Sequence, residues 1–134
     1  MAASSSIVVS TGPARGLVGG VARHMLLLED IARQLPVRLD YFEIGRRPEE
    51  TGAWAQLRRL VADYREFARR LRQARRESSQ VVAHVNSSVR PVCVVRDGGF
   101  VLIARALKVP VIYQVHGCML HGPDDGRPWL RCIT

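Results

Sequence analysis

Short apolar runs alternate along this chain with longer segments in which apolar residues recur every three or four positions. The short runs predict strands that are buried on both faces, and the longer segments predict amphipathic helices. In chain order, the segments predict strand, helix, strand, helix, strand, helix and strand. Their expected bounds are Ile7–Ser10, Gly20–Gln34, Val37–Ile44, Ala53–Glu77, Val81–Asn86, Pro91–Leu107 (with a break at Gly98-Gly99) and Pro110–Val115.

Alternation of strands with helices is typical of right-handed βαβ units, which build a parallel sheet covered by helices. We therefore expect an α/β fold, a Rossmann-like open parallel sheet with helices on both faces. Residues 118–134 are expected to be a loop or irregular tail, so no helix follows the last strand and the sheet is incomplete. Residues 1–134 would then form a single partial domain.

The turn after the first predicted strand is rich in glycine and lies where open α/β sheets bind ligands. Gly19 and Gly20 begin the next helix, whose free N–H groups and partial positive charge favour an anion such as phosphate. The glycine spacing fits neither the dinucleotide fingerprint nor the P-loop, so no nicotinamide cofactor or ATPase is expected. The alternative is that the glycines only let the helix pack on the sheet.

His116 directly follows the fourth predicted strand and so shares an edge of the sheet with the glycine turn. A neutral histidine there can donate a hydrogen bond to a sugar hydroxyl or a phosphate, although it can also cap local backbone. Asn86 and Ser87 end the third strand and are candidates to line the same cleft, with Arg90 and Gly117. Asn86 and Ser87 fit a turn or a helix cap equally well.

Other chemistry finds less support in the sequence. His84 lies inside the third strand, where a core histidine with satisfied hydrogen bonds is the preferred interpretation. His116, Cys118 and His121 match no zinc spacing and lack an evident fourth ligand, so no metal site is expected. The sequence shows no Ser-His-Asp or Cys-His order of catalytic residues with a nucleophile-elbow motif. It therefore gives no support for a hydrolase.

The formal net charge is +8, and all but one of the 20 basic residues are arginine. The polar face of the helix at Ala53–Glu77 has three interpretations: a solvated face, a contact with anionic lipid, or a contact with nucleic acid. Nucleic acid is the least supported, because no recognition motif or exposed aromatic series accompanies the charge. The face carries Arg58, Arg59, Arg65, Arg69, Arg70, Arg72, Arg75 and Arg76.

No apolar run approaches the roughly 20 residues of a membrane span, and the first residues lack the features of a secretory signal. Three cysteines without a CxxC pair favour free thiols in a reducing compartment. We therefore expect a cytoplasmic protein, and the arginine-rich helix adds peripheral contact with the inner membrane face as an alternative.

Several segments together carry a resemblance to a known family. They are Gly19-Gly20-Val-Ala-Arg-His24, Val82-Ala-His-Val-Asn-Ser-Ser88, Arg96-Asp97, Ile103-Ala-Arg105 and Val109-Pro-Val-Ile-Tyr-Gln-Val-His-Gly117. In their order and spacing, over residues 6–117, they resemble the N-terminal domain of a family-4 retaining glycosyltransferase with the GT-B fold.

The resemblance implies transfer of a sugar from a nucleotide-diphosphate sugar to a glycan or lipid-linked acceptor, as in polysaccharide biosynthesis. Family members usually need no essential metal. This domain would mostly hold the acceptor, with Gly19 and Gly20 near the donor diphosphate. His116 would contact the donor sugar or position the reacting groups.

One family feature is missing from the sequence. Family members have a second domain with two glutamates eight positions apart, and no two glutamates here have that spacing. The chain is therefore expected to be inactive alone. The alternative function is a non-catalytic Rossmann-like module that docks on anionic membrane or nucleic acid through its arginine-rich helix.

Overall fold

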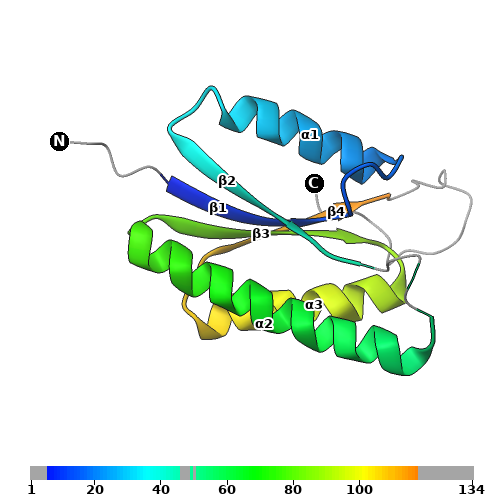
Figure 1. Ribbon diagram of the computed structural model, residues 1–134. Coiled ribbons are helices and arrows are strands. Elements are labelled where there is room, and N and C mark those ends of the chain that lie inside the picture. The colour runs from blue at the N-terminus through cyan, green and yellow to red at the C-terminus, as the bar shows by residue number, and fades with distance from the viewer. Residues whose placement is uncertain (1–5, 46–48, 50, 118–134) are drawn as a thin grey trace, which may run out of the picture.

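The computed structural model describes residues 6–45, 49 and 51–117, and its four described strands form one parallel sheet with helices on both faces (Figure 1). The predicted α/β class and open parallel sheet are confirmed, and the arrangement agrees with a Rossmann-like fold. In chain order the elements are β1 (Ser6–Gly12), α1 (Gly20–Ala32), β2 (Val37–Glu43), α2 (Ala53–Glu77), β3 (Val81–Ser88), α3 (Pro91–Ala106) and β4 (Val111–His116).

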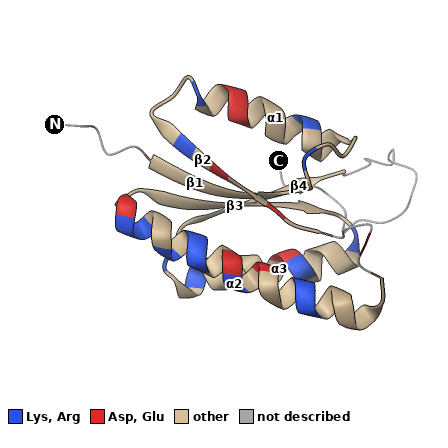
Figure 2. Ribbon diagram, in the orientation of Figure 1, with Lys and Arg blue, Asp and Glu red and all other residues tan. Residues whose placement is uncertain are grey.

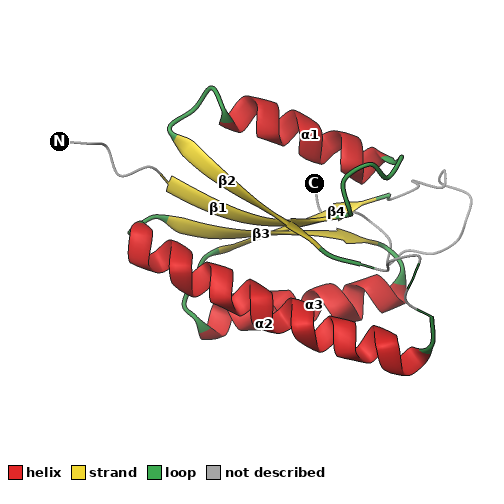
Figure 3. Cartoon of the chain, viewed as in Figure 1, coloured by secondary structure: helices red, strands yellow, loops and turns green. Residues whose placement is uncertain are grey.

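The strand order β2-β1-β3-β4 places β1 in the interior of the sheet. Every pair of neighbouring strands is parallel, so the carboxyl ends of all four share one edge. α1 covers one face, and α2 and α3 cover the other, as Figure 3 shows. β2 pairs with one side of β1, and β3 pairs with the other side. The direction in which strands are added to the sheet therefore reverses between β1 and β3.

The two faces of the sheet differ in chemistry. Towards α2 and α3 lies an apolar core, in which the rings of Phe67 and Phe100 meet edge to face with centroids 5.0 Å apart. Burial of each such ring stabilises the fold by roughly 1.5–3 kcal/mol. Towards α1, buried Met25 instead meets the polar side chains of Ser10 and Asn86. The buried polar side chains of Ser10, His84 and Asn86 are therefore grouped under α1.

The expected break of the third helix at Gly98-Gly99 is wrong, because α3 is continuous from Pro91 to Ala106. Gly99 is explained by packing: a Cβ there would lie 2.2 Å from the Tyr64 hydroxyl. That hydroxyl donates a hydrogen bond to the main-chain oxygen of Arg96 at 2.7 Å. Gly99 thus makes room for a side chain of α2, and the glycine pair does not end the helix.

Thr51 is of a residue type that often caps helices, but it does not cap α2. The N-cap of α2 is Gly52, whose φ of 96° favours glycine, and none of the described side chains caps this helix end. The predicted tail at 118–134, with Cys118 and His121, lies outside the described residues. None of the described helices combines the length and apolar character that a membrane span requires.

Candidate functional site

A cleft of about 220 Å³ opens at the carboxyl edge of the sheet. It lies at the reversal of strand order between β1 and β3, where open α/β sheets bind ligands. Complete small-molecule pockets typically enclose about 300–1,000 Å³, so this cleft suits one group or part of a larger ligand. Its lining residues are Gly12, Pro13, Leu17, Val21, Ile44, Gly45, Asn86, Ser87, Ser88 and Arg96.

Arg96 of α3 supplies a cation to this cleft. Its Nε donates to Oδ1 of the fully buried Asp97 at 2.7 Å, and no ion pair in the described part of the chain uses its terminal amino groups. Burial by itself lowers the pKa of Arg96, but the hydrogen bond and charge of Asp97 outweigh burial and raise it. The guanidinium is therefore cationic and has donors left for an anion.

Asn86 connects this cleft to His116. Its Nδ2 donates to the main-chain oxygen of Thr11 at 2.7 Å, so its Oδ1 is the acceptor 2.7 Å from His116 Nε2. His116 therefore carries a proton on Nε2, and in the neutral ring Nδ1 holds a lone pair. The carboxyl ends of β1, β3 and β4 are joined by this one amide.

His84 lies deeper on the same face of the sheet. Its Nδ1 is 2.9 Å from the Ser10 hydroxyl, and its Nε2 is 2.9 Å from Gln114 Oε1. Both ring nitrogens thus have partners, as the interpretation of a satisfied core histidine predicts. The pKa of His84 is lowered, mainly by burial and also by the charge of His24. The hydrogen bond with Gln114 raises this pKa but does not outweigh burial.

His24 of α1 is a member of this cluster that sequence reasoning did not single out. Its ring centroid is 5.0 Å from that of His116, with the planes tilted by 59°. Its Nε2 is buried and has no hydrogen-bond partner among the described residues. Burial first, and then the charges of His24 and His84, lower the pKa of His116. His24 lies one helical turn after Gly20 and ends the first of the segments that carry the family resemblance.

Gly19 and Gly20 are exposed and do not themselves line the cleft, although Leu17 and Val21 on either side of them do. A Cβ on either glycine would meet nothing within 4 Å, and the φ of Gly19, 169°, is extended backbone open to any residue. Close packing of α1 on the sheet therefore does not require these glycines. Within the described part of the chain, the surface above them is open.

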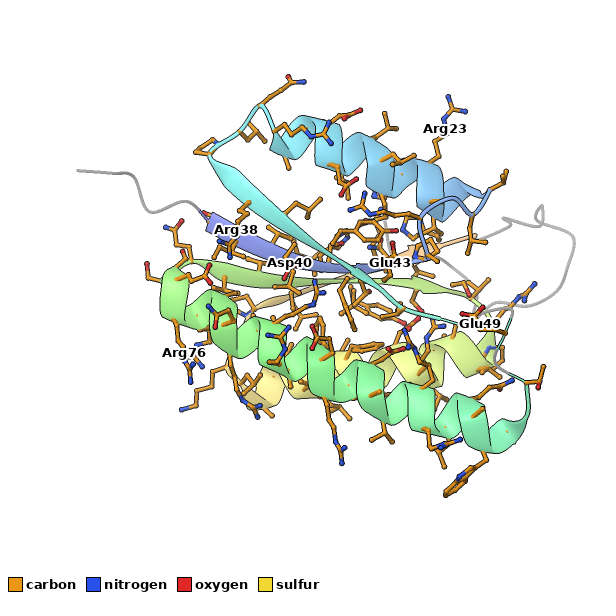
Figure 4. The ribbon with its side chains drawn as sticks, in the orientation of Figure 1. Arg23, Arg38, Asp40, Glu43, Glu49 and Arg76 are labelled. Atoms are coloured by element: carbon orange, nitrogen blue, oxygen red, sulfur yellow. The ribbon has the colours of Figure 1, made fainter. Side chains whose placement is uncertain are left out.

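The loop between β1 and α1 is held by side chains around it. Arg15 binds both carboxylate oxygens of Glu29, and its backbone N–H donates to Glu43 Oε1 at 3.2 Å. The Tyr41 hydroxyl donates to the main-chain oxygen of Pro13, and burial raises its pKa. Figure 4 labels Glu43 on β2, which forms one end of this attachment. The loop conformation thus depends on β2 and α1 together.

The predicted site residues are only partly brought together. Asn86 and Ser87 line the cleft, and His116 contacts Asn86. Arg90 is exposed at the N-cap of α3, and Gly117 is exposed with a φ of 78°; neither lines the cleft. In the part of the chain that the structure describes, no group of three or more His, Cys, Asp or Glu side chains could hold a metal ion.

Comparisons with family models, with curated proteins and with solved structures give no match to this chain. The chemistry of the cleft is therefore the basis for a functional proposal. Arg96 can pair with a negatively charged group, and the hydroxyls of Ser87 and Ser88 can bind polar groups beside it. Such a combination suits a ligand that is both anionic and rich in hydroxyls.

Proposed function

We propose that this chain is the acceptor-side, N-terminal Rossmann-like part of a glycosyltransferase with GT-B architecture. Its ligands would be a nucleotide-diphosphate sugar and a glycan or lipid-linked acceptor. The observation that carries the proposal is the meeting of the glycine turn and His116 at one sheet edge, beside a cleft at the reversal of strand order. His24 provides the link, because it follows Gly20 by one turn and contacts His116.

In this proposal His116 binds a hydroxyl of the sugar. Asn86 fixes the Nε2–H of its ring, which leaves Nδ1 to accept a hydrogen bond from a ligand hydroxyl. The lowered pKa of His116, caused first by burial, keeps the ring neutral near pH 7 and so keeps that lone pair available. The His116 ring is half-buried and fixed by Asn86, so a hydrogen bond to its Nδ1 can position a reacting sugar.

Arg96 pairs with one phosphate of the donor at the cleft, and the open surface over Gly19 and Gly20 receives the other part of the diphosphate. The two glycines have no packing role in the described structure, and the absence of a side chain allows a phosphate to approach the backbone N–H groups at the start of α1. Sugar and charge would thus be bound at separate points along one edge.

The test is an NMR titration of the whole chain with nucleotide-diphosphate sugars that differ in base and sugar. Backbone amides of the glycine turn and of Ser87 and Ser88 should shift on binding. Arg96→Gln should weaken binding at least tenfold, because a charge-assisted hydrogen bond contributes about 1.5–3 kcal/mol. Arg105→Gln, an exposed arginine of the same helix, is the matched control.

Two results would overturn the proposal. One is the absence of shifts at the carboxyl edge with every nucleotide-diphosphate sugar and with simple glycans. The other is equal weakening by Arg96→Gln and Arg105→Gln, which would mean that the interaction is a general effect of positive charge. Arg90→Gln, at the exposed N-cap of α3, should leave binding almost unchanged if Arg96 is the residue that binds the anion.

A further inference from the structure

Four arginines of α2 form a row along its outer side. They follow one another at intervals of seven, seven and four residues, so they lie within about 40° of one another around the helix and extend over about 27 Å. All four are exposed, and none has an ion-pair partner in the described part of the chain. This arginine row consists of Arg58, Arg65, Arg72 and Arg76.

The acidic residues of α2 do not neutralise this row. Asp63 is buried and pairs with Arg59. Glu66 pairs with Arg69 and Arg70, and Glu77 pairs with Arg38 of β2. The one acidic residue of α3, Asp97, is fully buried. Figure 2 shows several Lys and Arg positions along α2 beyond its N-terminal turn, and they give this side of the protein its positive charge.

An exposed apolar seam runs beside the arginine row. The contact of Tyr64 with Gly99 shows which sides of α2 and α3 face each other. Positions three, four or seven residues from these two share their sides of the helices. On these sides Phe67 and Leu71 are buried in the core, whereas five other large apolar side chains are between 40% and 80% exposed. This apolar seam consists of Leu57, Val61, Val92, Val95 and Leu102.

Trp54 lies where the row and the seam meet. It precedes Arg58 by four residues and Val61 by seven, and its side chain is 69% exposed. Helices that lie in the interface of a membrane typically have a basic face, an apolar face and an aromatic side chain such as tryptophan on the apolar face. Tryptophan is enriched at that depth because its ring is apolar and its N–H is polar.

We propose that the outer surface of α2 and α3 docks on the surface of an anionic lipid bilayer. The arginine row pairs with lipid phosphates, and Trp54 and the apolar seam enter the boundary between headgroups and acyl chains. A second copy of the chain fits less well, because two arginine rows would face each other. Nucleic acid fits less well because the aliphatic seam offers no ring on which bases could stack. This inference does not depend on the proposed glycosyltransferase function.

The test is sedimentation of the whole chain with vesicles, either of phosphatidylcholine alone or with phosphatidylglycerol added. Binding should require the anionic lipid and should weaken as salt is raised. The double variant Arg65→Gln/Arg72→Gln should lower the partition coefficient roughly 30-fold, the usual effect of two basic residues near an anionic surface.

A matched control removes the same charge from the opposite face. Arg23 and Arg33 lie at α1 and are exposed, and Figure 4 shows Arg23 and Arg76 on opposite outer sides of the protein. The variant Arg23→Gln/Arg33→Gln should bind these vesicles almost as well as the unmodified chain. Equal losses in the two double variants would overturn the proposal, as would the absence of binding to anionic vesicles at low salt.

Two further readouts separate lipid insertion from simple attraction of charge. Trp54 fluorescence should shift to shorter wavelength on anionic vesicles, and Trp54→Phe should remove that shift although Trp129 remains. Salt screens the arginine row but not the apolar seam, so some vesicle binding should remain at high salt. The double variant Val95→Ser/Leu102→Ser should weaken this remaining binding. Tighter binding to a short DNA duplex than to anionic vesicles, at the same ionic strength, would assign the surface to nucleic acid and overturn the proposal.

Discussion

His116 donates its Nε2–H to Asn86 Oδ1 across 2.7 Å, and Asn86 donates from Nδ2 to the main-chain oxygen of Thr11. One side chain of β3 thereby fixes the ring at the end of β4 and the backbone at the end of β1. The His116–Asn86 part of the candidate site is therefore held by strands of the sheet rather than by loops.

Replacement of this amide should be costly for the fold. Asn86→Ala leaves the oxygen of Thr11 and the ring of His116 without their partner, so the free energy of unfolding should fall by about 1–3 kcal/mol. Urea denaturation followed by circular dichroism measures this change. Ser88→Ala, at the half-buried end of the same strand, should change stability by less than about 0.5 kcal/mol. Equal effects would show that Asn86 is not the connecting residue.

His24→Gln should raise the pKa of His116. The lowered value in the unmodified protein comes first from burial and then from the charges of His24 and His84, and this variant removes one of those charges. Histidine ring resonances followed by NMR across neutral pH report the shift. Arg23→Gln removes a neighbouring exposed charge that does not contribute to the shift and should leave the pKa of His116 unchanged. A fall in the pKa after His24→Gln would contradict the expected charge repulsion.

Stability should decrease as the pH falls below about 6.5. Burial is the main cause that lowers the pKa values of His84 and His116 in the folded protein, so the unfolded chain binds more protons in this range. The contribution of these two histidines to the free energy of unfolding is complete when the pH is above their pKa in the unfolded chain. It is lost as the pH falls towards their lower pKa values in the folded protein.

Urea midpoints between about pH 8 and pH 5 test this dependence. The double variant His84→Gln/His116→Gln should flatten the curve in that range. Glu66, whose pKa the Arg69 hydrogen bond lowers to about 2, does not titrate there. A stability that rises as the pH falls would oppose the sign derived from burial.

Two adjacent glycines of α3 should respond in opposite directions to alanine. At Gly99 a Cβ would lie 2.2 Å from the Tyr64 hydroxyl, so Gly99→Ala should destabilise the protein by about 1–3 kcal/mol. At Gly98 a Cβ would meet nothing within 4 Å, so Gly98→Ala should stabilise the helix by about 0.5–1 kcal/mol. Urea denaturation of the pair measures both. A similar sign for both variants would contradict the packing of Tyr64 on α3.

The order and type of all described elements could be predicted because they depend on local patterns. Apolar runs such as the one at Ile7–Val9 indicate a buried strand, and the spacing in Ala53–Glu77 indicates a helix, without knowledge of any partner. The continuity of α3 could not be predicted in this way. Gly99 has the local signature of a helix break, and its purpose is visible only when Tyr64 from another helix occupies the space that its missing side chain leaves.

The candidate site was predictable to a similar extent. The shared edge of Asn86, Ser87 and His116 follows from parallel strands, since the carboxyl ends of such strands coincide. Arg96 and His24 enter from helices, and their direction depends on how each helix is rotated on the sheet. Sequence spacing alone therefore favoured Arg90, which follows the end of β3 by two residues, over Arg96, which lines the cleft.

The interior position of β1 has a consequence for synthesis on the ribosome. Ser10 of β1 and its partner His84 of β3 are 74 residues apart in the chain. At about 5–20 residues per second, β1 waits roughly 4–15 s before this neighbour is made. During that interval β2 can occupy one side of β1, while the other side remains an open template for pairing with a neighbouring nascent chain.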